Sequence, residues 1–527
     1  MEPRVMLSAG GLIHEQEKSA DNHYGLKSPW ELIYNPIDQA PHGRFECEAD
    51  DLVVFGDIPK EIDGTFYRLH PDPNVLPKDD VPFIDGDGMI SAFRIINGKV
   101  SMKMKYIETE RYLLERQAGK RLFGRYRNPY DCHPCVRMAN DNVANTNIIY
   151  WGGELLAMAE RGLPYSVDPD TLETKTYDPY GGQTKARAFT AHPKEDRLTN
   201  ELVTYSMAAK GLHSPDYCTY SVSPDGKISN EFWFKTDVPG SPHDAWVTEN
   251  WIILSNMPFR VNKDENMREE NADHWVYAPY APHEFLVAPR RPNGPQLHGW
   301  KEGEFRTYIY EPGLVIHTGG GWEEKDGTLT LESPWATFNT FPFFTVEDGS
   351  ELPKLAEGQV PTSDWVRWKL DLTKPSGTKV ADPEILYRGL TDFPAIDDRL
   401  VTQRTKIVYL TCMAPNAFRF EKIVRLDTET GQTDEFFAPP NGGFAEPVLI
   451  RRSDDAPEGD GWLLVYTFRS SSPKGELTLL DTRDMKNPIA VIQLPFQTRL
   501  QVHGNWVPNP HPGTPLPPLA EVLEFFE

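Results

Sequence analysis

The chain has 527 residues, and its 54 Lys and Arg against 78 Asp and Glu give a formal net charge of −24 with His neutral. Hydrophobic residues make up 39% and charged residues 25%, a balance typical of globular enzymes that excludes disordered, collagen-like and membrane-embedded classes. Because nucleic acid and anionic membranes bind clustered Lys and Arg, we expect no nucleic-acid partner for so acidic a chain.

The N-terminal segment 1–11 contains no apolar stretch long enough for a signal peptide, and no run of about 18 apolar residues occurs anywhere in the sequence. The 5 cysteines are an odd number, and the sequence has no Asn-x-Ser/Thr sequon. Both features are typical of a reducing compartment. We therefore expect a cytoplasmic protein with no transmembrane segment.

Short runs rich in β-branched and aromatic residues dominate the rest of the chain, and they alternate with polar turns containing Asp, Asn, Gly or Pro. Helical periodicity predicts only two short helices, at Glu110–Leu122 and Glu351–Glu357. In chain order, the strand pattern predicts seven hairpins, at Phe93–Tyr106, Pro164–Tyr177, Thr219–Phe234, Gly299–Tyr310, Val366–Tyr387, Ile423–Phe437 and Leu477–Leu494.

Hairpins spread over the whole length favour a radial arrangement of small antiparallel sheets over a sandwich, which would use up its strands in far fewer residues. The expected fold class is all-β, a seven-bladed β-propeller. No linker divides the chain, so we predict a single domain over 1–527 with an N-terminal extension at 1–45. The largest insertion, at 259–298, is expected to contribute to a dome of loops and short helices over the propeller axis.

Histidine outnumbers cysteine by 14 to 5, so any bound metal should be held mainly by imidazole. Four histidines adjoin strand-like apolar runs in different hairpin units and could face one axis in a radial fold: His192, His243, His317 and His503. Unrelated core or surface histidines remain the alternative, because no local motif joins any two of them. The one C-x-x-C, Cys132 to Cys135, is expected to be two loop cysteines, since no second pair accompanies it.

The sequence resembles the carotenoid cleavage dioxygenase family over nearly the whole chain. Three segments, together with the acidic context Ala445–Val448, are similar to its four-histidine signature: Phe189–Lys194, Pro242–Asn250 and Val502–Trp506. Within the family the chain looks closest to the branch that cleaves lignostilbene and resveratrol, through the segments Glu61–Arg68, Gly86–Met89, Tyr126–Pro129, Ala144–Asn147, Phe341–Phe344 and Ala456–Trp462. The family fold is a seven-bladed propeller, which agrees with the separate count of hairpins.

The resemblance implies an Fe(II) enzyme with O₂ as co-substrate, which splits an alkene C=C bond into two carbonyl products. Four neutral imidazoles would leave two octahedral positions open and keep the full 2+ charge on the iron. By resemblance, the ligands are His192, His243, His317 and His503, carboxylates that orient them are Glu160, Asp392 and Glu446, and Thr146 stands near an open position. The positions that match substrate-cavity residues are Phe83, Tyr126 and Phe343.

Two departures bear on the substrate and on the site. Stilbene-cleaving members carry a Lys where this chain has Ala159, and that Lys favours the phenolate form of the substrate. If the segment continues a strand, Arg161 shares a face with Ala159 and could substitute for this Lys, although a solvent-facing arginine is the alternative. Asp392 replaces the usual Glu, so it must approach its histidine more closely or reach it through water. The expected partner is a small hydrophobic alkene, foremost a phenolic one such as a stilbenoid or a vinyl- or propenylphenol. An apocarotenoid, or carotenoid, is the second candidate.

Two other classes of function stay open at this stage. One is a propeller that only binds ligands after losing its active site, which Ala159 and Asp392 would favour and the intact four histidines oppose. The other is a zinc hydrolase, which is disfavoured because four protein nitrogens would fill a tetrahedral zinc and leave no place for water. The oligomeric state is not evident from the sequence.

Overall fold

Seven antiparallel sheets make up the described part of the chain in the computed structural model. The described residues are 46–75, 84–124, 132–262, 275–294, 296–341, 344–351, 360–414, 417–440, 442–469, 472, 474–499 and 502–509. We number the sheets as blades 1 to 7 in the order in which the chain builds them. The seven-bladed β-propeller expected from the hairpins is confirmed.

The strands of each blade follow, in their order across the sheet. Blade 1 contains β1 (Cys47–Ala49), β5 (Lys99–Tyr106), β4 (Asp87–Ile96), β3 (Gly64–Asp72) and β31 (His503–Pro508). Blade 2 contains β6 (Asn147–Trp151), β7 (Glu154–Met158), β8 (Tyr165–Val167) and β9 (Thr174–Tyr177). Blade 3 contains β10 (Lys194–Asp196), β11 (Glu201–Ser206), β12 (Asp216–Val222) and β13 (Ile228–Lys235). Blade 4 contains β14 (Gly240–Val247), β15 (Trp251–Val261), β17 (His283–Pro289) and β18 (Arg306–Tyr310), with β16 (Trp275–Tyr277) paired to β15.

The last three blades have the same construction. Blade 5 contains β19 (Gly321–Glu323), β20 (Thr328–Ala336), β21 (Ser363–Asp371) and β22 (Glu384–Tyr387). Blade 6 contains β23 (Thr391–Ile396), β24 (Ile407–Ala414), β25 (Ala417–Asp427) and β26 (Thr433–Phe437). Blade 7 contains β27 (Gly442–Arg451), β28 (Gly461–Arg469), β29 (Glu476–Asp481), β30 (Asp484–Gln493) and β2 (Val53–Gly56). Among the described residues, the helical elements are α3 (Glu110–Ala118), η3 (Pro134–Val136) and η5 (Asp398–Leu400).

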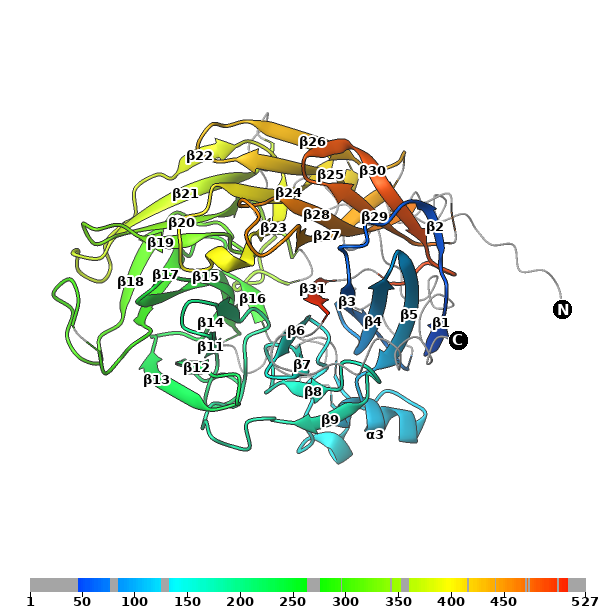
Figure 1. Cartoon of the computed structure of the whole chain (residues 1–527). Coiled ribbons are helices and arrows are strands. Elements are labelled where there is room, and N and C mark those ends of the chain that lie inside the picture. Colours follow the sequence, from blue (N-terminus) through cyan, green and yellow to red (C-terminus); the bar gives the residue numbers. More distant parts are fainter. Residues whose placement is uncertain are drawn as a thin grey trace.

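Two strand pairings close the ring of blades (Figure 1). The last strand, β31, pairs with β3 of the first blade, and β2 from the start of the described chain pairs with β30 of the last blade. Each end of the chain therefore contributes a strand to a sheet built mainly by the other end. The closure leaves β31 near the centre of the ring, and this strand begins at His503.

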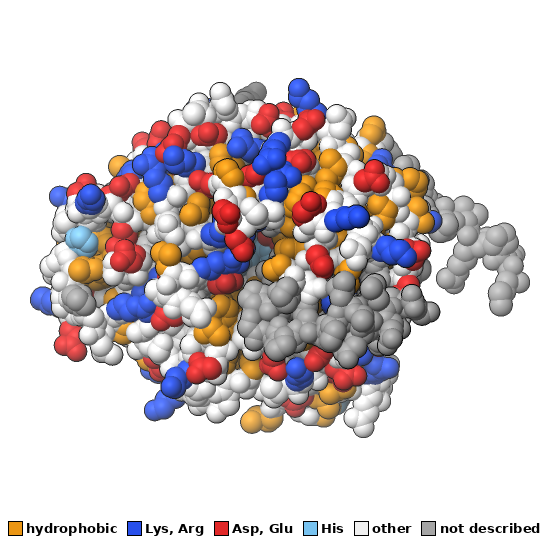
Figure 2. Space-filling model, viewed as in Figure 1, with side chains coloured by type: hydrophobic (Ala, Val, Ile, Leu, Met, Phe, Trp, Pro, Cys, Tyr) orange, Lys and Arg blue, Asp and Glu red, His pale blue; other side chains and the backbone are white. Residues whose placement is uncertain are grey.

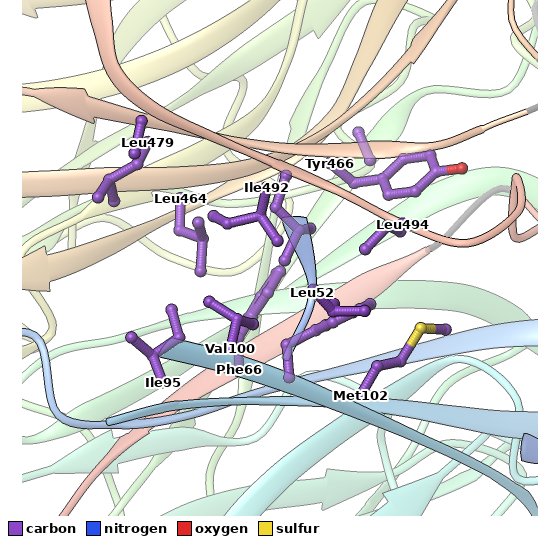
Figure 3. Close-up of a cluster of buried hydrophobic side chains, with 14 of the residues drawn as sticks. Leu52, Phe66, Ile95, Val100, Met102, Leu464, Tyr466, Leu479, Ile492 and Leu494 are labelled. Carbon is purple, nitrogen blue, oxygen red and sulfur yellow. The ribbon is translucent and has the colours of Figure 1, made fainter. Parts of the chain in front are cut away.

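The hydrophobic core lies between neighbouring blades rather than along the axis. Figure 3 shows the cluster between blades 1 and 7, where Phe66 and Val100 of one blade face Leu464, Leu479 and Ile492 of the other. Comparable clusters fill the other blade interfaces. Because burial between blades supplies the apolar contacts, the axis is free for polar side chains.

Six of the seven predicted hairpins occur, each as adjacent strands of a different blade. The hairpin predicted at Gly299–Tyr310 is wrong, because only its second half is a strand, β18, and that strand pairs with β17. Helix α3 confirms the first predicted helix, with Thr109 as its N-cap and Gly119 as its C-cap. The helix predicted at Glu351–Glu357 falls almost entirely outside the described residues.

The stretch 259–298, expected as an insertion, contains blade strands as well as loop. β16 and β17 both pair with β15, so this part of the stretch belongs to blade 4, and 263–274 lie outside the described residues, as does the extension 1–45. On the face shown in Figure 2, basic side chains lie among acidic ones. Within the described residues, no helix has the length and apolar composition needed to cross a membrane.

Candidate metal centre

Four histidines converge at the centre of the propeller, each from a different blade. His192 lies two residues before β10, His243 lies within β14, His317 precedes β19, and His503 is the first residue of β31. One nitrogen of each imidazole lies within 4.8 Å of the other three, and the Nε2 atoms of His192 and His243 are 2.9 Å apart. The structure thus brings together all four histidines predicted from the sequence.

Three of these imidazoles contact a carboxylate through Nδ1. His243 donates to Glu160 Oε1 at 2.6 Å, and His317 donates to Asp392 Oδ1 at 2.8 Å. The third pair joins His503 Nδ1 to Glu446 Oε1 at 3.1 Å, while Glu446 Oε2 also accepts from the backbone N–H of the following residue, Gly504. Because an ionised carboxylate only accepts hydrogen bonds, Nδ1 carries the proton and Nε2 keeps its lone pair.

The three acids come from the three blades that supply no histidine. Glu160 follows β7 of blade 2, Asp392 is the second residue of β23 in blade 6, and Glu446 lies in β27 of blade 7. Every blade therefore places one titratable side chain at the axis. Asp392 contacts its histidine directly, so of the two expected alternatives the shorter side chain takes the close approach rather than a contact through water.

Irregular inner strands explain how these side chains reach the axis. The register of β14 shifts between Pro242 and Ala245, around His243. The same kind of shift occurs in β23 after Asp392 and in β27 around Glu446. A β-bulge interrupts the strict alternation of side chains along a strand and changes the direction of one of them. Such a change can turn a side chain toward the centre of the propeller.

Burial decides the protonation of two of the histidines. It lowers the pKa of His192 well below the usual range, and the neighbouring His243 lowers it further. Burial also lowers the pKa of His243, although Glu160 opposes this. For His317 burial acts in the same direction, but Asp392 outweighs it and the pKa is raised. The neutral imidazole, which is the form that binds metals, is thus favoured at His192 and His243.

The donor set fits a divalent transition metal. The Nε2 atoms of His317 and His503 are buried and have no hydrogen-bond partner among the described residues, although buried nitrogen is costly to leave unpaired. Ligands about 2.1 Å from a shared ion would lie roughly 3 Å apart when adjacent, close to the 2.9 Å between His192 and His243. An ion that prefers nitrogen would satisfy the unpaired atoms together.

A cavity opens beside this centre, with His243 and His317 among its lining residues. Its polar wall includes Thr146, whose amide donates to Met158 O and whose hydroxyl lies 3.2 Å from Asn145 Oδ1. The rest of the wall is mainly apolar and aromatic: Ile84, Met257, Phe259, Trp275, Ile316, Phe341, Phe344, Phe393 and Val502. Such a cavity suits a flat or extended apolar ligand held against the imidazoles.

Some residues predicted to lie at the site are outside the described residues or lie elsewhere than expected. Phe83, Tyr126 and Phe343 lie outside the described residues, so their predicted place in the substrate cavity stays a prediction. Strand β7 ends at Met158, and the segment after it is a turn. Arg161 therefore does not share a strand face with Ala159; it forms an ion pair with Asp141.

Sequence reasoning missed one aromatic residue at the centre and left one motif unused. Phe393 stacks on the His317 ring, with centroids 4.7 Å apart, and the only signal for it is its position after Asp392. Of the C-x-x-C pair, Cys132 is buried and Cys135 is exposed, and both are free thiols. Cys132 lies in a loop, as expected, whereas Cys135 lies in the short helix η3.

Comparison with known proteins gives relatives along most of the chain. The sequence profile of the family described as retinal pigment epithelial membrane protein (RPE65) matches residues 41–508. Resveratrol cleavage oxygenase 1 of Botryotinia fuckeliana (strain B05.10) is 43% identical over 495 residues, which cover 92% of this chain and 88% of the relative. Isoeugenol monooxygenase of Pseudomonas nitroreducens is 35% identical over 484 residues, covering 89% and 96%. The crystal structure of Pseudomonas brassicacearum lignostilbene dioxygenase matches with a TM-score of 0.82 at 33% identity, covering 89% of this chain and 97% of that one.

Proposed function

Since the chain belongs to the RPE65 family, the carotenoid oxygenases, we propose that it is a non-haem Fe(II) oxygenase that cleaves the C=C bond of a small aromatic alkene. One alkene and one O₂ give two carbonyl products, so the C=C bond is replaced by two C=O bonds and no other reductant is needed. The observation that carries the proposal is the group of four imidazoles, three buried and one half-buried, beside a cavity lined by aromatic side chains.

In this proposal each group at the centre has a separate task. His192, His243, His317 and His503 hold the iron, which when bound supplies the activation of dioxygen. Glu160, Asp392 and Glu446 fix the tautomer and the ring plane of their histidines. Thr146 limits access to the space beside the imidazoles, where its side chain lines the cavity.

The cavity wall orients the alkene and keeps water away from it. Phe341 and Phe344 offer flat apolar surfaces, and we propose that Phe83, Tyr126 and Phe343 extend this wall, as the resemblance implies. An apolar, water-poor wall favours a conjugated alkene over a charged substrate. A phenolic alkene is the first candidate, by similarity to relatives named for resveratrol, isoeugenol and lignostilbene.

An apocarotenoid is the second candidate, because of Ala159. Its side chain is 3% exposed and carries no charge that would favour a phenolate, and the nearby Arg161 is paired with Asp141. If no other group replaces the Lys of stilbene-cleaving members, cleavage does not depend on an ionised phenol. Substrates with a masked phenol or with no phenol would then be accepted.

The test is a defined panel of alkenes with the anaerobically prepared, iron-loaded protein. The panel contains resveratrol, 4-vinylphenol, isoeugenol, their O-methyl ethers and an apocarotenal. Oxygen consumption and product masses identify the cleaved bond, and metal analysis gives iron per chain. We expect about one iron per chain and one O₂ consumed per alkene cleaved. A protein that holds no iron, or iron without cleavage of any member of the panel, would contradict the proposal.

A pair of His→Ala variants supplies the control. His243→Ala removes a central imidazole and should abolish both iron binding and cleavage. His298→Ala removes an exposed imidazole that does not belong to the four-histidine group and should change neither. If His243→Ala kept its activity, the metal centre would lie elsewhere.

We also propose that the whole chain acts as one domain in the cytoplasm. The pairings of β31 with β3 and of β2 with β30 support one cooperative unit, because neither end of the described chain can leave without opening a blade. Limited proteolysis should therefore leave one core fragment, and two independently folding fragments would contradict this.

A further inference from the structure

Asp244, the residue that follows His243, is a buried carboxylate that faces two other histidine-bearing segments. It lies at the register shift of β14 and is 1% exposed. Its side chain forms no hydrogen bond with any of the four imidazoles, so it is separate from the three acids described above. Its two carboxylate oxygens nevertheless contact the segments that carry His192 and His317.

Each oxygen contacts a different blade. Oδ1 accepts from Lys194 Nζ at 2.8 Å, and Lys194 stands two residues after His192 at the start of β10. Oδ2 accepts from the backbone N–H of Thr318 at 2.7 Å, and Thr318 directly follows His317. The Thr318 hydroxyl lies 2.9 Å from both Asp244 Oδ2 and Ala245 O, between which it shares its one proton.

These contacts connect three of the four ligand segments through one side chain. We propose that Asp244 is a positioning residue that sets the spacing of His192, His243 and His317, and so the affinity of the site for its metal. This inference rests on the proposed metal centre. It is distinct from the proposed reaction, because it concerns the distance between blades 3, 4 and 5 rather than the chemistry at the iron.

His192 depends most on these contacts, because it is the histidine without a carboxylate partner in the described part of the chain. The other three imidazoles each have a carboxylate on Nδ1, whereas no carboxylate contacts the His192 side chain among the described residues. Its segment is held instead by the bond from its backbone N–H to Thr190 Oγ1 and by the ion pair of Lys194 with Asp244. Loss of Asp244 would remove a main constraint on the histidine that has no acid of its own.

Charge and burial both favour a full carboxylate at this position. Hydrogen bonds to an ionised group are shorter and stronger than those between neutral groups, so they define the separation of the segments better. Lys194 balances the charge of Asp244, so the pair can fix the geometry without reducing the positive charge at the iron. An Asn would keep one acceptor but would turn an NH₂ group toward either Lys194 or the N–H of Thr318.

The experiment compares Asp244→Asn with three other variants of the full chain. Lys194→Met and Thr318→Val each remove one partner of Asp244. Asp397→Asn is the matched control, because Asp397 is also 1% exposed and forms an ion pair with Arg399, but it contacts no ligand segment. Iron affinity is measured by chelator competition, and the visible absorption of the Co(II)-loaded protein reports the ligand geometry.

We expect Asp244→Asn to weaken iron binding by about 10- to 100-fold, with smaller losses for Lys194→Met and Thr318→Val and none for Asp397→Asn. The difference in melting temperature between iron-loaded and metal-free protein should also shrink in Asp244→Asn, because this difference depends on metal affinity. A residue with only a structural role would lower both melting temperatures equally. The Co(II) spectrum should change in Asp244→Asn and not in Asp397→Asn.

The inference is overturned if Asp244→Asn keeps the iron affinity and Co(II) spectrum of the parent while losing only stability, as Asp397→Asn would. If Asp244→Asn does not fold, unchanged iron affinity in both Lys194→Met and Thr318→Val overturns it. A parent protein that binds no metal at all would refute the proposed function itself. The two failures are therefore distinguishable.

Discussion

Asp392 supports the metal centre from blade 6, and its replacement by Ala is a quantitative test of that support. Asp392 Oδ1 accepts from His317 Nδ1 at 2.8 Å and from the backbone N–H of Phe393 at 2.9 Å. Asp392→Ala leaves both donors without their acceptor. Phe393 has a φ of 46°, in the left-handed region that a side chain of this size rarely adopts, so its local conformation also loses support.

The expected magnitude follows from these two bonds. An unsatisfied buried donor costs about 1–3 kcal/mol, and two donors lose their acceptor here, so we expect the free energy of unfolding to fall by at least about 2 kcal/mol. A freely rotating His317 should weaken metal binding by about 10- to 100-fold. That range corresponds to about 1.4–2.8 kcal/mol of binding free energy.

The assays are urea unfolding of the metal-free protein and chelator competition for iron. Asp454→Ala is the control, since Asp454 is 97% exposed, and it should change stability by no more than about 0.5 kcal/mol. Asp392→Glu restores the acceptor but adds a methylene to a tight site; it should keep more of the iron affinity than Asp392→Ala while losing about 1–3 kcal/mol of stability. If Asp392→Ala binds iron as tightly as the parent, direct support of His317 by Asp392 is refuted.

Three further predictions concern the fold and the cavity. Burial raises the pKa of Asp87 from 3.8 to about 6, against the opposing charge of Arg111. The folded state therefore favours the neutral carboxyl, and the free energy of unfolding falls as the pH rises from about 4 through 6. Above pH 6, Asp87→Asn should remove a cost of about 3 kcal/mol. Urea unfolding that shows no gain in stability for Asp87→Asn at pH 8 would contradict this. Gly88→Ala places a Cβ 2.2 Å from the backbone oxygen of Ala144, so unfolding should become easier by at least about 2 kcal/mol, and an unchanged midpoint would disprove the close approach. Phe341→Ala should raise the substrate KM by about tenfold at unchanged iron content, and a lower iron content instead would assign Phe341 to the metal centre.

Local sequence was sufficient for most of the hairpins. The predicted turn at Asn97–Gly98 has both residues at positive φ, a conformation that Asn and Gly tolerate, so the turn residues themselves define the hairpin. The failure at Gly299–Tyr310 has a tertiary cause. Trp300 packs at a tilt against Trp251, with ring centroids 4.4 Å apart, and donates its indole N–H to Leu372 O, so contacts between distant segments hold this stretch as a loop.

The metal centre was only partly predictable. The four histidines could be selected by their strand-like setting and by resemblance, but their convergence depends on closure of the ring, which brings β31 to the centre. Asp244 gave no signal, because an acid after a histidine is ordinary in the sequence. Its role depends on contacts with Lys194 and Thr318 from neighbouring blades.

The sequence by itself determined six of the seven expected hairpins, the all-β class and the residues that could bind a metal, because turn chemistry and side-chain type act over a few residues. Only the tertiary structure decided which acid supports which histidine. Glu160 and His243 are 83 residues apart and yet 2.6 Å from each other. A hydrogen bond requires placement within a few tenths of an ångström, and here that placement comes from β-bulges and from the packing between blades, which no local pattern encodes.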